Sequence, residues 1–239
     1  MPRHKIERQE EVSTANWKQI LTLAEHLDFS QARMVPPFQY WLSGCLALDW
    51  INGKRINEIL TLKRKSITTT ETQIKFRYHI GKKRSRGAPI ELQPYQKNRN
   101  INHQAVPYIL RYLEEYDNKI SDQDTYLFPV NTQPRTRTVT TKFTNGKGEQ
   151  QSKTYTYQDQ AGHLYEENAQ FWLTKINLQL PPNKRLYFHY GRHNIGISQA
   201  YKGRSDIQIA DILDETPRAA LEYTKHARGL SEDWSRETE

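Results

Sequence analysis

The sequence predicts a mixed α+β fold that is mainly helical, with a small antiparallel β-sheet or hairpin. Three observations support this prediction. Most apolar residues recur at helical spacing, in segments separated by Gly and Pro. Residues 72–93 instead alternate between apolar and polar side chains around a turn bounded by glycines. Residues 135–166 alternate on both sides of Asn145-Gly146, a pair typical of β-hairpin turns.

The composition indicates a basic, polar protein. The 239 residues carry a formal net charge of +8, only 36% are hydrophobic, and 14 are tyrosines. This charge favours a polyanionic partner, nucleic acid first and an anionic membrane second. No apolar run approaches the length of a membrane span, and the first residues lack the apolar region of a secretory signal. We therefore expect a cytoplasmic protein.

Cys45 is the single cysteine of the chain and lies in an apolar run. It has no internal disulfide partner and no zinc-ligand set nearby, so a small core residue in a reducing cytosol is the expected role.

The first third of the chain predicts two consecutive helices. Ser13 or Thr14 can cap a helix through residues 16–27. Pro36 and Pro37 then interrupt the chain before residues 38–50, which are apolar nearly all round. A helix of that kind is predicted to be buried at the centre of the domain.

A short helix is predicted within residues 53–67, after Gly53 ends the central helix. Arg55 stands at its start and Glu58 follows one helical turn later. An exposed Arg–Glu pair at this spacing contributes little and is the plainest interpretation of the two residues alone. The expected buried side consists of Ile56, Ile59, Leu60 and Leu62.

The predicted hairpin of residues 72–93 has a cationic turn, GKKRSRG. A solvated tip is one interpretation. In the other, the tip enters a DNA groove and one lysine reaches a scissile phosphate. Lys82, directly after the first Gly, is the first candidate, and Lys83 is its competitor.

The middle of the chain predicts two further helices and an insertion. Residues 103–116 and 168–180 have the amphipathic pattern of helices, and residues 126–129, YLFP, form a short buried stop. Residues 135–166 predict an exposed, basic hairpin rich in Tyr and Thr. Three interpretations of this hairpin stay open: an insertion without function, a source of extra DNA contacts, or a protein contact.

The segment 189–226 concentrates reactive side chains. His189 and Arg192 are three residues apart and share one face if the segment is helical. Tyr223 lies in a short segment that begins at Thr216-Pro217. An imidazole, a guanidinium and a phenol near the end of a basic chain suggest chemistry on a phosphodiester.

These landmarks together resemble the catalytic domain of tyrosine recombinases, the phage-integrase type. GKRINEILTL resembles the first-arginine motif of the family, with Arg55 as the arginine and Glu58 in support. YHIGKKRSRGAPIEL resembles its lysine-bearing hairpin, and YLFP its apolar stop. HYGRH resembles the histidine-x-x-arginine box, with His189 and Arg192. Tyr223 stands where the family has its nucleophile.

The resemblance implies a definite chemistry. Arg55 and Arg192 would clamp the non-bridging oxygens of a phosphodiester with permanently charged forks. Tyr223 would become covalently joined to the 3′ phosphate, and His189 would accept or orient its proton. The intermediate conserves the phosphodiester energy, so neither a metal nor another cofactor is expected.

The resemblance also assigns the basic residues. Lys82, or its competitor Lys83, would protonate the departing 5′ oxygen. Double-stranded DNA is the implied partner, with self-assembly into dimers or tetramers on it. The residues expected to bind DNA are Lys54, Lys63, Arg64, Lys83, Arg84 and Arg86.

Two positions depart from the family pattern. A leucine-glycine-histidine triplet is usual before the nucleophile helix, and this chain has Leu213-Asp214-Glu215. Either acid can occupy the histidine position, and Glu215 is preferred because it takes the third place; Asp214 and His193 are then supporting residues. Gly191 stands where a leucine is usual.

The expected organisation is a charged tail at 1–12, a catalytic domain at 13–226 with the 135–166 insertion, and a C-terminal tail at 227–239. Leu230 and Trp234 are the predicted anchors by which this tail docks onto a neighbouring protomer. The core-binding domain usual at the N-terminus of the family is not expected in this chain.

The implied activity is site-specific recombination or integration of DNA, in a prokaryotic cytosol or nucleoid. A phage or a mobile element is one expected source of the gene. The alternatives are a DNA-binding relative with weak or no catalysis, favoured by the acids at 214–215, and a type-IB-like topoisomerase. A nonspecific basic protein is the plainest alternative.

Overall fold

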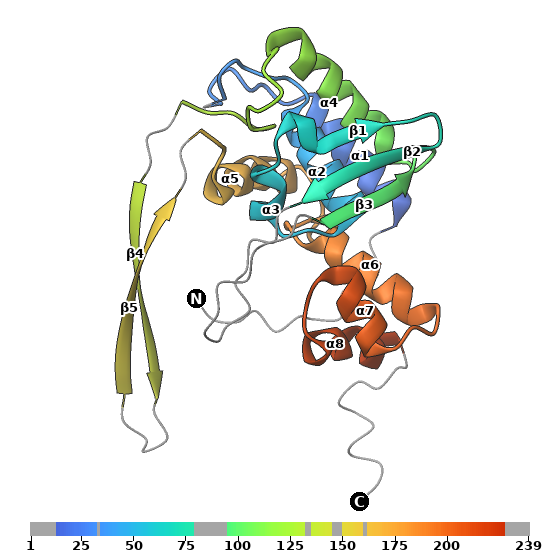
Figure 1. Ribbon diagram of the computed structural model, residues 1–239, viewed down its shortest axis with the longest axis vertical. Helices are drawn as coiled ribbons and strands as arrows, with labels where there is room; N and C mark the ends of the chain where they lie inside the picture. Colours follow the sequence, from blue (N-terminus) through green and yellow to red (C-terminus); the bar gives the residue numbers. More distant parts are fainter. Residues whose placement is uncertain are drawn as a thin grey trace, which may run out of the picture.

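The computed structural model describes residues 13–32, 34–78, 95–131, 135–144, 150–159 and 162–227. Helices dominate these residues, and the strands form one three-stranded sheet and one separate hairpin (Figure 1). The elements are α1 (Thr14–Glu25), α2 (Trp41–Asn52), α3 (Ile56–Leu60), η1 (Arg64–Ser66), β1 (Ile67–Thr69), β2 (Gln73–Tyr78), β3 (Tyr95–Asn100), α4 (Val106–Lys119), β4 (Arg135–Thr144), β5 (Gln150–Asp159), α5 (Glu166–Asn177), η2 (Pro182–Lys184), α6 (Tyr190–Tyr201), α7 (Asp206–Leu213) and α8 (Pro217–Ala227).

Helix α2 forms the centre of the larger part of the molecule, as predicted. All of its residues are buried, Cys45 included, because α1, α4, α5 and α6 all pack against it. Ser13 caps α1 by accepting a hydrogen bond from the backbone N–H of Asn16 at 3.2 Å. Gly53 ends α2 in the left-handed conformation, with φ of 58°.

The three-stranded antiparallel sheet has the order β1-β2-β3. Strand β2 confirms the predicted alternation, since Ile74, Phe76 and Tyr78 are fully buried. The predicted second strand, up to residue 93, lies outside the described residues, and the strand that pairs with β2 in the described part of the chain is β3, Tyr95–Asn100. Strand β1 was not predicted, because three residues are too short to display a period.

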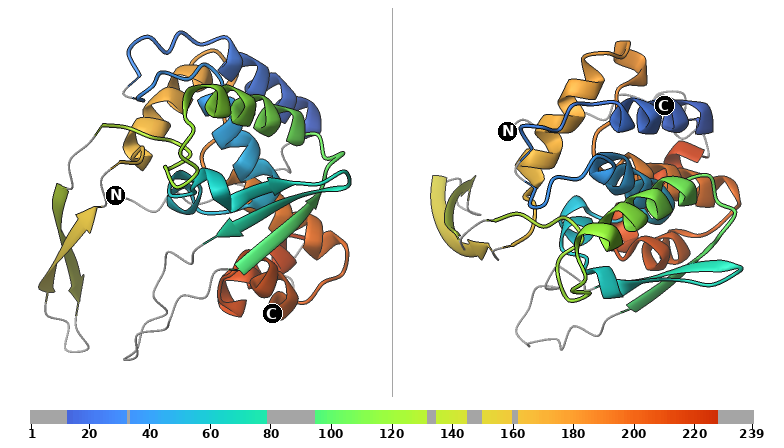
Figure 2. Two further views of the ribbon diagram at one scale, coloured as in Figure 1. Left: turned by 45° about the horizontal axis from the view of Figure 1, so that its top comes forward. Right: turned by 90° about the horizontal axis from the view of Figure 1, so that it is seen from above.

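The predicted inserted hairpin is present as β4 and β5, which pair in register from Arg135 opposite Asp159 to Thr144 opposite Gln150. It stands apart from the helices in every view (Figures 1 and 2). Thr138, Thr140, Thr154 and Thr156 are exposed. A two-stranded hairpin of this kind is marginally stable by itself.

Helices α6, α7 and α8 form a smaller unit beside the sheet (Figure 1). Its core is a second cluster of apolar side chains, distinct from the large cluster around α2, and Tyr223 belongs to it together with Ile197, Ile209, Ala210, Leu213 and Ala220. Ser205 caps α7 in a reciprocal capping box with Gln208. The predicted reactive residues Arg55, His189, Arg192 and Tyr223 lie where these two apolar clusters meet.

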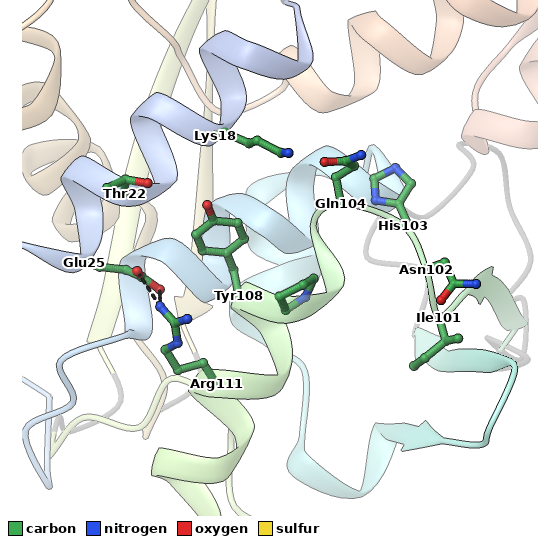
Figure 3. A pocket seen from close by; sticks show the side chains of 10 residues that line it. Lys18, Thr22, Glu25, Ile101, Asn102, His103, Gln104, Tyr108 and Arg111 are labelled. Atoms are coloured by element: carbon green, nitrogen blue, oxygen red, sulfur yellow. Dashed lines mark hydrogen bonds and ion pairs between the residues drawn. The ribbon is translucent and has the colours of Figure 1, made fainter.

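A depression with a volume of about 700 Å³ lies between α1 and α4 (Figure 3). Lys18 and Glu25 line it from α1, and Tyr108 and Arg111 from α4, with Arg111 paired to Glu25 at 2.6 Å. None of the predicted reactive residues lines it. Within the described ranges, no helix combines the length and apolarity needed to cross a membrane.

Candidate active site

Arg55 is presented by the turn between α2 and α3. The Glu58 carboxylate accepts hydrogen bonds from the Arg55 backbone N–H at 3.3 Å and from its guanidinium at 3.2 Å, which ties Arg55 to the first turn of α3. The Glu58 side chain is nearly buried, whereas 31% of the Arg55 side chain remains exposed. The pair predicted from spacing therefore fixes a guanidinium at the surface, where a ligand can reach it.

Arg192 lies in the first turn of α6 and is 6% exposed. Its guanidinium donates to the backbone carbonyl of Gly53 at 3.2 Å and to the Glu215 carboxylate at 2.9 Å. The other oxygen of Glu215 is buried and has no partner among the described residues. Arg192 thus joins the turn that carries Arg55 to the connection between α7 and α8.

His189 caps α6 in a left-handed conformation, with φ of 98°. Burial, followed by the charges of His193, Arg192 and Arg55, lowers the pKa of His189 to about 4. Its Nδ1 is buried without a partner in the described part of the chain. The imidazole is therefore neutral near pH 7 and retains a ring nitrogen able to accept a proton.

A carboxylate from α2 holds this conformation of His189. Asp49 Oδ2 accepts the backbone N–H groups of His189 at 3.4 Å and Gly191 at 3.3 Å. These are N–H groups of the first turn of a helix, which have no partner within the helix itself. Asp49 was not predicted as a site residue, because a single acid in an apolar run carries no motif.

The Asp49 contact also explains Gly191. A Cβ at this position would lie 2.0 Å from the backbone oxygen of Asp49. Real side chains never approach a backbone oxygen so closely, so the crossing of α2 and α6 requires glycine here. The departure at Gly191 from the family's usual leucine is thus a consequence of backbone packing.

Tyr223 lies in α8 and is 8% exposed. Its ring packs edge-on against His193, with ring centroids 5.7 Å apart, and against the bare Cα of Gly196. Burial, and then the nearby Glu215 carboxylate, raise the pKa of Tyr223 to about 12, while Arg192 and Arg55 oppose the rise. The phenol is therefore protonated near neutral pH and needs a base in order to act as a nucleophile.

The structure brings five of the predicted residues into one site. Arg55 and His189 interact electrostatically, and both Arg55 and Arg192 act on Tyr223. Glu215, rather than Asp214, forms an ion pair with Arg192. The predicted residues Lys82, Lys83, Arg84 and Arg86 lie outside the described residues, as do the tail anchors Leu230 and Trp234.

Three residues expected to bind DNA are held by acids instead. Lys54 is fully buried and ion-paired with Asp214, so it does not face solvent as expected of a DNA contact. Arg64 makes a bidentate ion pair with Asp117, with both distances 2.7 Å. Lys63 lies 3.8 Å from Asp124 and remains partly exposed.

Lys97 is a lysine of the site that the sequence reasoning missed. It pairs with Phe76 across β2 and β3, and directly opposed residues share one face of a sheet. Its ammonium lies 3.6 Å from Asp214 and donates to the backbone carbonyl of Ile212. Burial, and then the charge of Lys54, lower the pKa of Lys97 to about 7. In the sequence, Lys97 and Arg99 alternate with the amide residues Gln96, Asn98 and Asn100, and this alternation is the signal that was missed.

Asp49 provides a prediction on pH dependence. Burial raises the pKa of Asp49 from 3.8 to about 7. The folded state therefore holds a proton that the unfolded state releases, so stability at this site falls as pH rises from about 4 to about 7. Asp49→Asn keeps an acceptor for the two N–H groups and has no charge.

At pH 8 we expect Asp49→Asn to unfold at a higher denaturant concentration than the wild type. The difference between the two proteins is expected to shrink toward pH 5. Each unit between folded and unfolded pKa corresponds to about 1.4 kcal/mol. Urea unfolding at both pH values measures this. Asp49→Ala, which removes the acceptor, is the control and is expected to be less stable than Asp49→Asn at both. The prediction would be contradicted if the free energy of unfolding changed equally with pH in the wild type and in Asp49→Asn.

The described residues have the fold of a tyrosine recombinase catalytic domain. This fold is mainly helical with a small antiparallel sheet, as predicted. In particular, the chain resembles two solved structures of the XerH site-specific recombinase. One is a post-cleavage complex bound to the palindromic difH substrate, with a TM-score of 0.54. The other is a pre-cleavage complex bound to difH, with a TM-score of 0.51.

Sequence identity is 14% to both XerH chains, and the matches cover 96% and 93% of this chain. They cover 53% and 52% of the XerH chains, so this chain spans about half the length of the structures it matches. No family model matches the sequence, and no curated protein does so. The similarity is therefore one of fold.

Proposed function

We propose that this chain cleaves and rejoins double-stranded DNA through a covalent 3′-phosphotyrosine at Tyr223, as a site-specific recombinase or integrase. The observation that carries the proposal is the convergence of Arg55, His189, Arg192 and Tyr223 from three separate elements. Two permanently charged forks, a neutral imidazole and a phenol make up a set suited to attack on a phosphodiester.

In the proposed reaction, the Tyr223 oxygen forms a bond to phosphorus and the bond from phosphorus to the 5′ oxygen breaks. His189 takes the phenol proton, for which its neutral state suits it. Arg55 and Arg192 stabilise the charge that develops on the non-bridging oxygens. Rejoining reverses these steps with a 5′ hydroxyl as the nucleophile, so the energy of the phosphodiester is retained.

The departing 5′ oxygen needs a proton donor, and a lysine is the proposed source. Lys82 and Lys83 remain the candidates from the sequence. Lys97 is a third, because its lowered pKa of about 7 lets it give up a proton near neutral pH. Comparing Lys82→Met, Lys83→Met and Lys97→Met on a substrate with a 5′-phosphorothiolate at the scissile bond identifies the donor, since only the donor variant is rescued by that better leaving group.

Two observations favour an alternative, a DNA-binding relative with weak or no catalysis. Glu215 already occupies one side of the Arg192 fork, and its charge opposes ionisation of Tyr223. Glu215 also brings negative charge to a place where a phosphate would bind. The test of the proposed function must therefore detect chemistry, and binding alone is insufficient.

The test is trapping of the covalent intermediate. The protein is incubated with a pool of nicked duplexes of randomised sequence and separated on a denaturing gel. We expect an adduct whose DNA is joined to the peptide that contains Tyr223. Tyr223→Phe is expected to form none, and Tyr201→Phe, which alters an exposed tyrosine on α6, is the matched control. An adduct that still forms with Tyr223→Phe would refute the proposed enzymatic activity. A wild type that forms no adduct would also refute it.

A positive result leaves recombination and topoisomerase activity to be separated. Relaxation of a supercoiled plasmid without joining of two duplexes would favour the topoisomerase. Recovery of recombinant products between two copies of the sequence selected in the adduct would favour the recombinase, which we also propose to assemble on DNA.

The β4–β5 hairpin is proposed to add DNA contacts. Its strands contain four cationic residues and one acid: Arg135, Arg137, Lys142, Lys153 and Asp159. We expect deletion of residues 135–159 to weaken DNA binding and to reduce the slope of log affinity against log salt by up to about 3, since each contacted phosphate contributes about 0.9. Fluorescence anisotropy measures both. Unchanged affinity with a changed oligomeric state would instead indicate a protein contact.

A further inference from the structure

Asp214 occupies an unusual backbone position next to the site. It ends α7 in the left-handed conformation, with φ of 52° and ψ of 54°. Glycine adopts this conformation at least cost, and a non-glycine residue there is retained only where its surroundings compensate. Aspartate is among the few other residues that tolerate this conformation, and its side chain here makes contacts that a glycine would lack.

The compensation comes from two lysines. Lys54, which is fully buried, forms an ion pair with Asp214. Lys97 approaches the same carboxylate oxygen at 3.6 Å and also binds the carbonyl of Ile212 at the end of α7. One carboxylate thus ties together the turn after α2, the sheet and the α7–α8 connection. We call these three residues the Lys54–Asp214–Lys97 cluster.

The cluster lies directly alongside the reactive residues in the chain. Lys54 precedes Arg55, and Asp214 precedes Glu215, which binds Arg192. Arg192 in turn donates to the carbonyl of Gly53, the residue before Lys54. The Lys54–Asp214 ion pair therefore joins the turn after α2 to the α7–α8 connection, and the Arg192–Glu215 ion pair joins the same connection to α6.

We infer that Asp214 is a positioning residue, which uses Lys54 and Lys97 to hold the α7–α8 connection so that Glu215 meets Arg192 and Tyr223 is carried into the site. The inference rests on the proposed function for its catalytic consequence. It predicts that the charge of Asp214, and not its shape, sets the rate of adduct formation. It also predicts that the acids at 214 and 215 act together rather than independently.

The variants separate charge from backbone. Asp214→Asn tolerates the left-handed conformation and keeps the shape, but loses the charge. Asp214→Gly relieves the backbone and loses the side chain. Lys54→Met removes the buried ammonium and keeps the length. With both Lys54→Met and Asp214→Asn, the buried pair becomes neutral, while Lys97 can still donate to the carbonyl of Ile212.

The first measurement is the rate of adduct formation at saturating DNA, together with the DNA concentration at half-saturation. We expect Asp214→Asn and Asp214→Gly each to lower the rate at least tenfold, with half-saturation within twofold of the wild type. The double variant Lys54→Met/Asp214→Asn is expected to react within twofold of Asp214→Asn alone, because both lack the same ion pair. A rate within twofold of the wild type for Asp214→Asn, or strictly additive effects of the two changes, would overturn the inference.

The second measurement does not depend on catalysis. Urea unfolding of the wild type, Asp214→Asn, Glu215→Gln and the double variant forms a double-mutant cycle. Coupled effects, with the double variant less affected than the sum of the single changes, are expected, and additive effects would overturn the inference. A wild type that forms no adduct while the cycle shows coupling would refute the proposed function and leave the positioning role of Asp214 supported.

Discussion

Replacing Arg192 with alanine is expected to lower the rate of covalent adduct formation by roughly 10²–10³-fold, the usual effect of losing one donor to a developing oxyanion. In the proposed reaction, Arg192 is one of two guanidiniums that meet the non-bridging oxygens, and Arg55 remains as the other. Single-turnover trapping on the DNA recovered from the adduct measures the rate.

The same change is expected to destabilise the fold, because Glu215 is left as a buried carboxylate with neither oxygen paired. Removing one partner of a buried pair costs about 3–5 kcal/mol. The control is Arg192→Ala/Glu215→Gln, which removes both charges and is expected to regain most of the stability while remaining slow. A double variant that folds like the wild type and reacts at the wild-type rate would exclude Arg192 from the chemistry.

The second large effect is expected from Gly191→Ala. The added methyl group would lie 2.0 Å from the backbone oxygen of Asp49 and 2.8 Å from the backbone nitrogen of Trp50. Both contacts are to backbone in the centre of the domain, which cannot move aside as the end of a flexible side chain can. We expect α6 to shift away from α2, with a loss of about 3 kcal/mol or more in the free energy of unfolding.

Urea unfolding measures this loss, and adduct formation is expected to fall with it, because the shift displaces His189 and Arg192 together. Ser198→Ala, which alters a half-buried position on the same helix, is the control and is expected to change stability by less than about 0.5 kcal/mol. A change in stability of less than about 0.5 kcal/mol for Gly191→Ala would mean that α2 and α6 do not cross as closely as described.

The fold class could be predicted from the sequence because its signals are local. Helix α2 is apolar all round and hence buried, Ser13 and Gly53 mark helix ends, and β2 alternates. Each of these depends on neighbours within a few residues along the chain. The pairing of β3 with β2 over Tyr95–Asn100 could not be predicted in the same way, since strand pairing depends on a partner elsewhere in the chain.

The reactive residues divide along the same line. Arg55, His189, Arg192 and Tyr223 were expected as a set because their short motifs, taken in order, resemble those of tyrosine recombinases. Lys97 and Asp49 have no such motif. Their importance follows only from the residues they face: Lys97 faces Asp214 across the boundary of the two clusters, and Asp49 faces the first turn of α6.

The sequence by itself thus determined the helical class, the central position of α2 and the chemical types that meet at the site. Tertiary structure decided which acid contacts Arg192, why residue 191 is glycine and why Lys54 is buried rather than exposed to DNA. The physical reason is that charge pairing and close backbone approach depend on distances between segments that are far apart in the chain. Residue 54 meets residue 214, and residue 49 meets residue 191, only after the chain has folded.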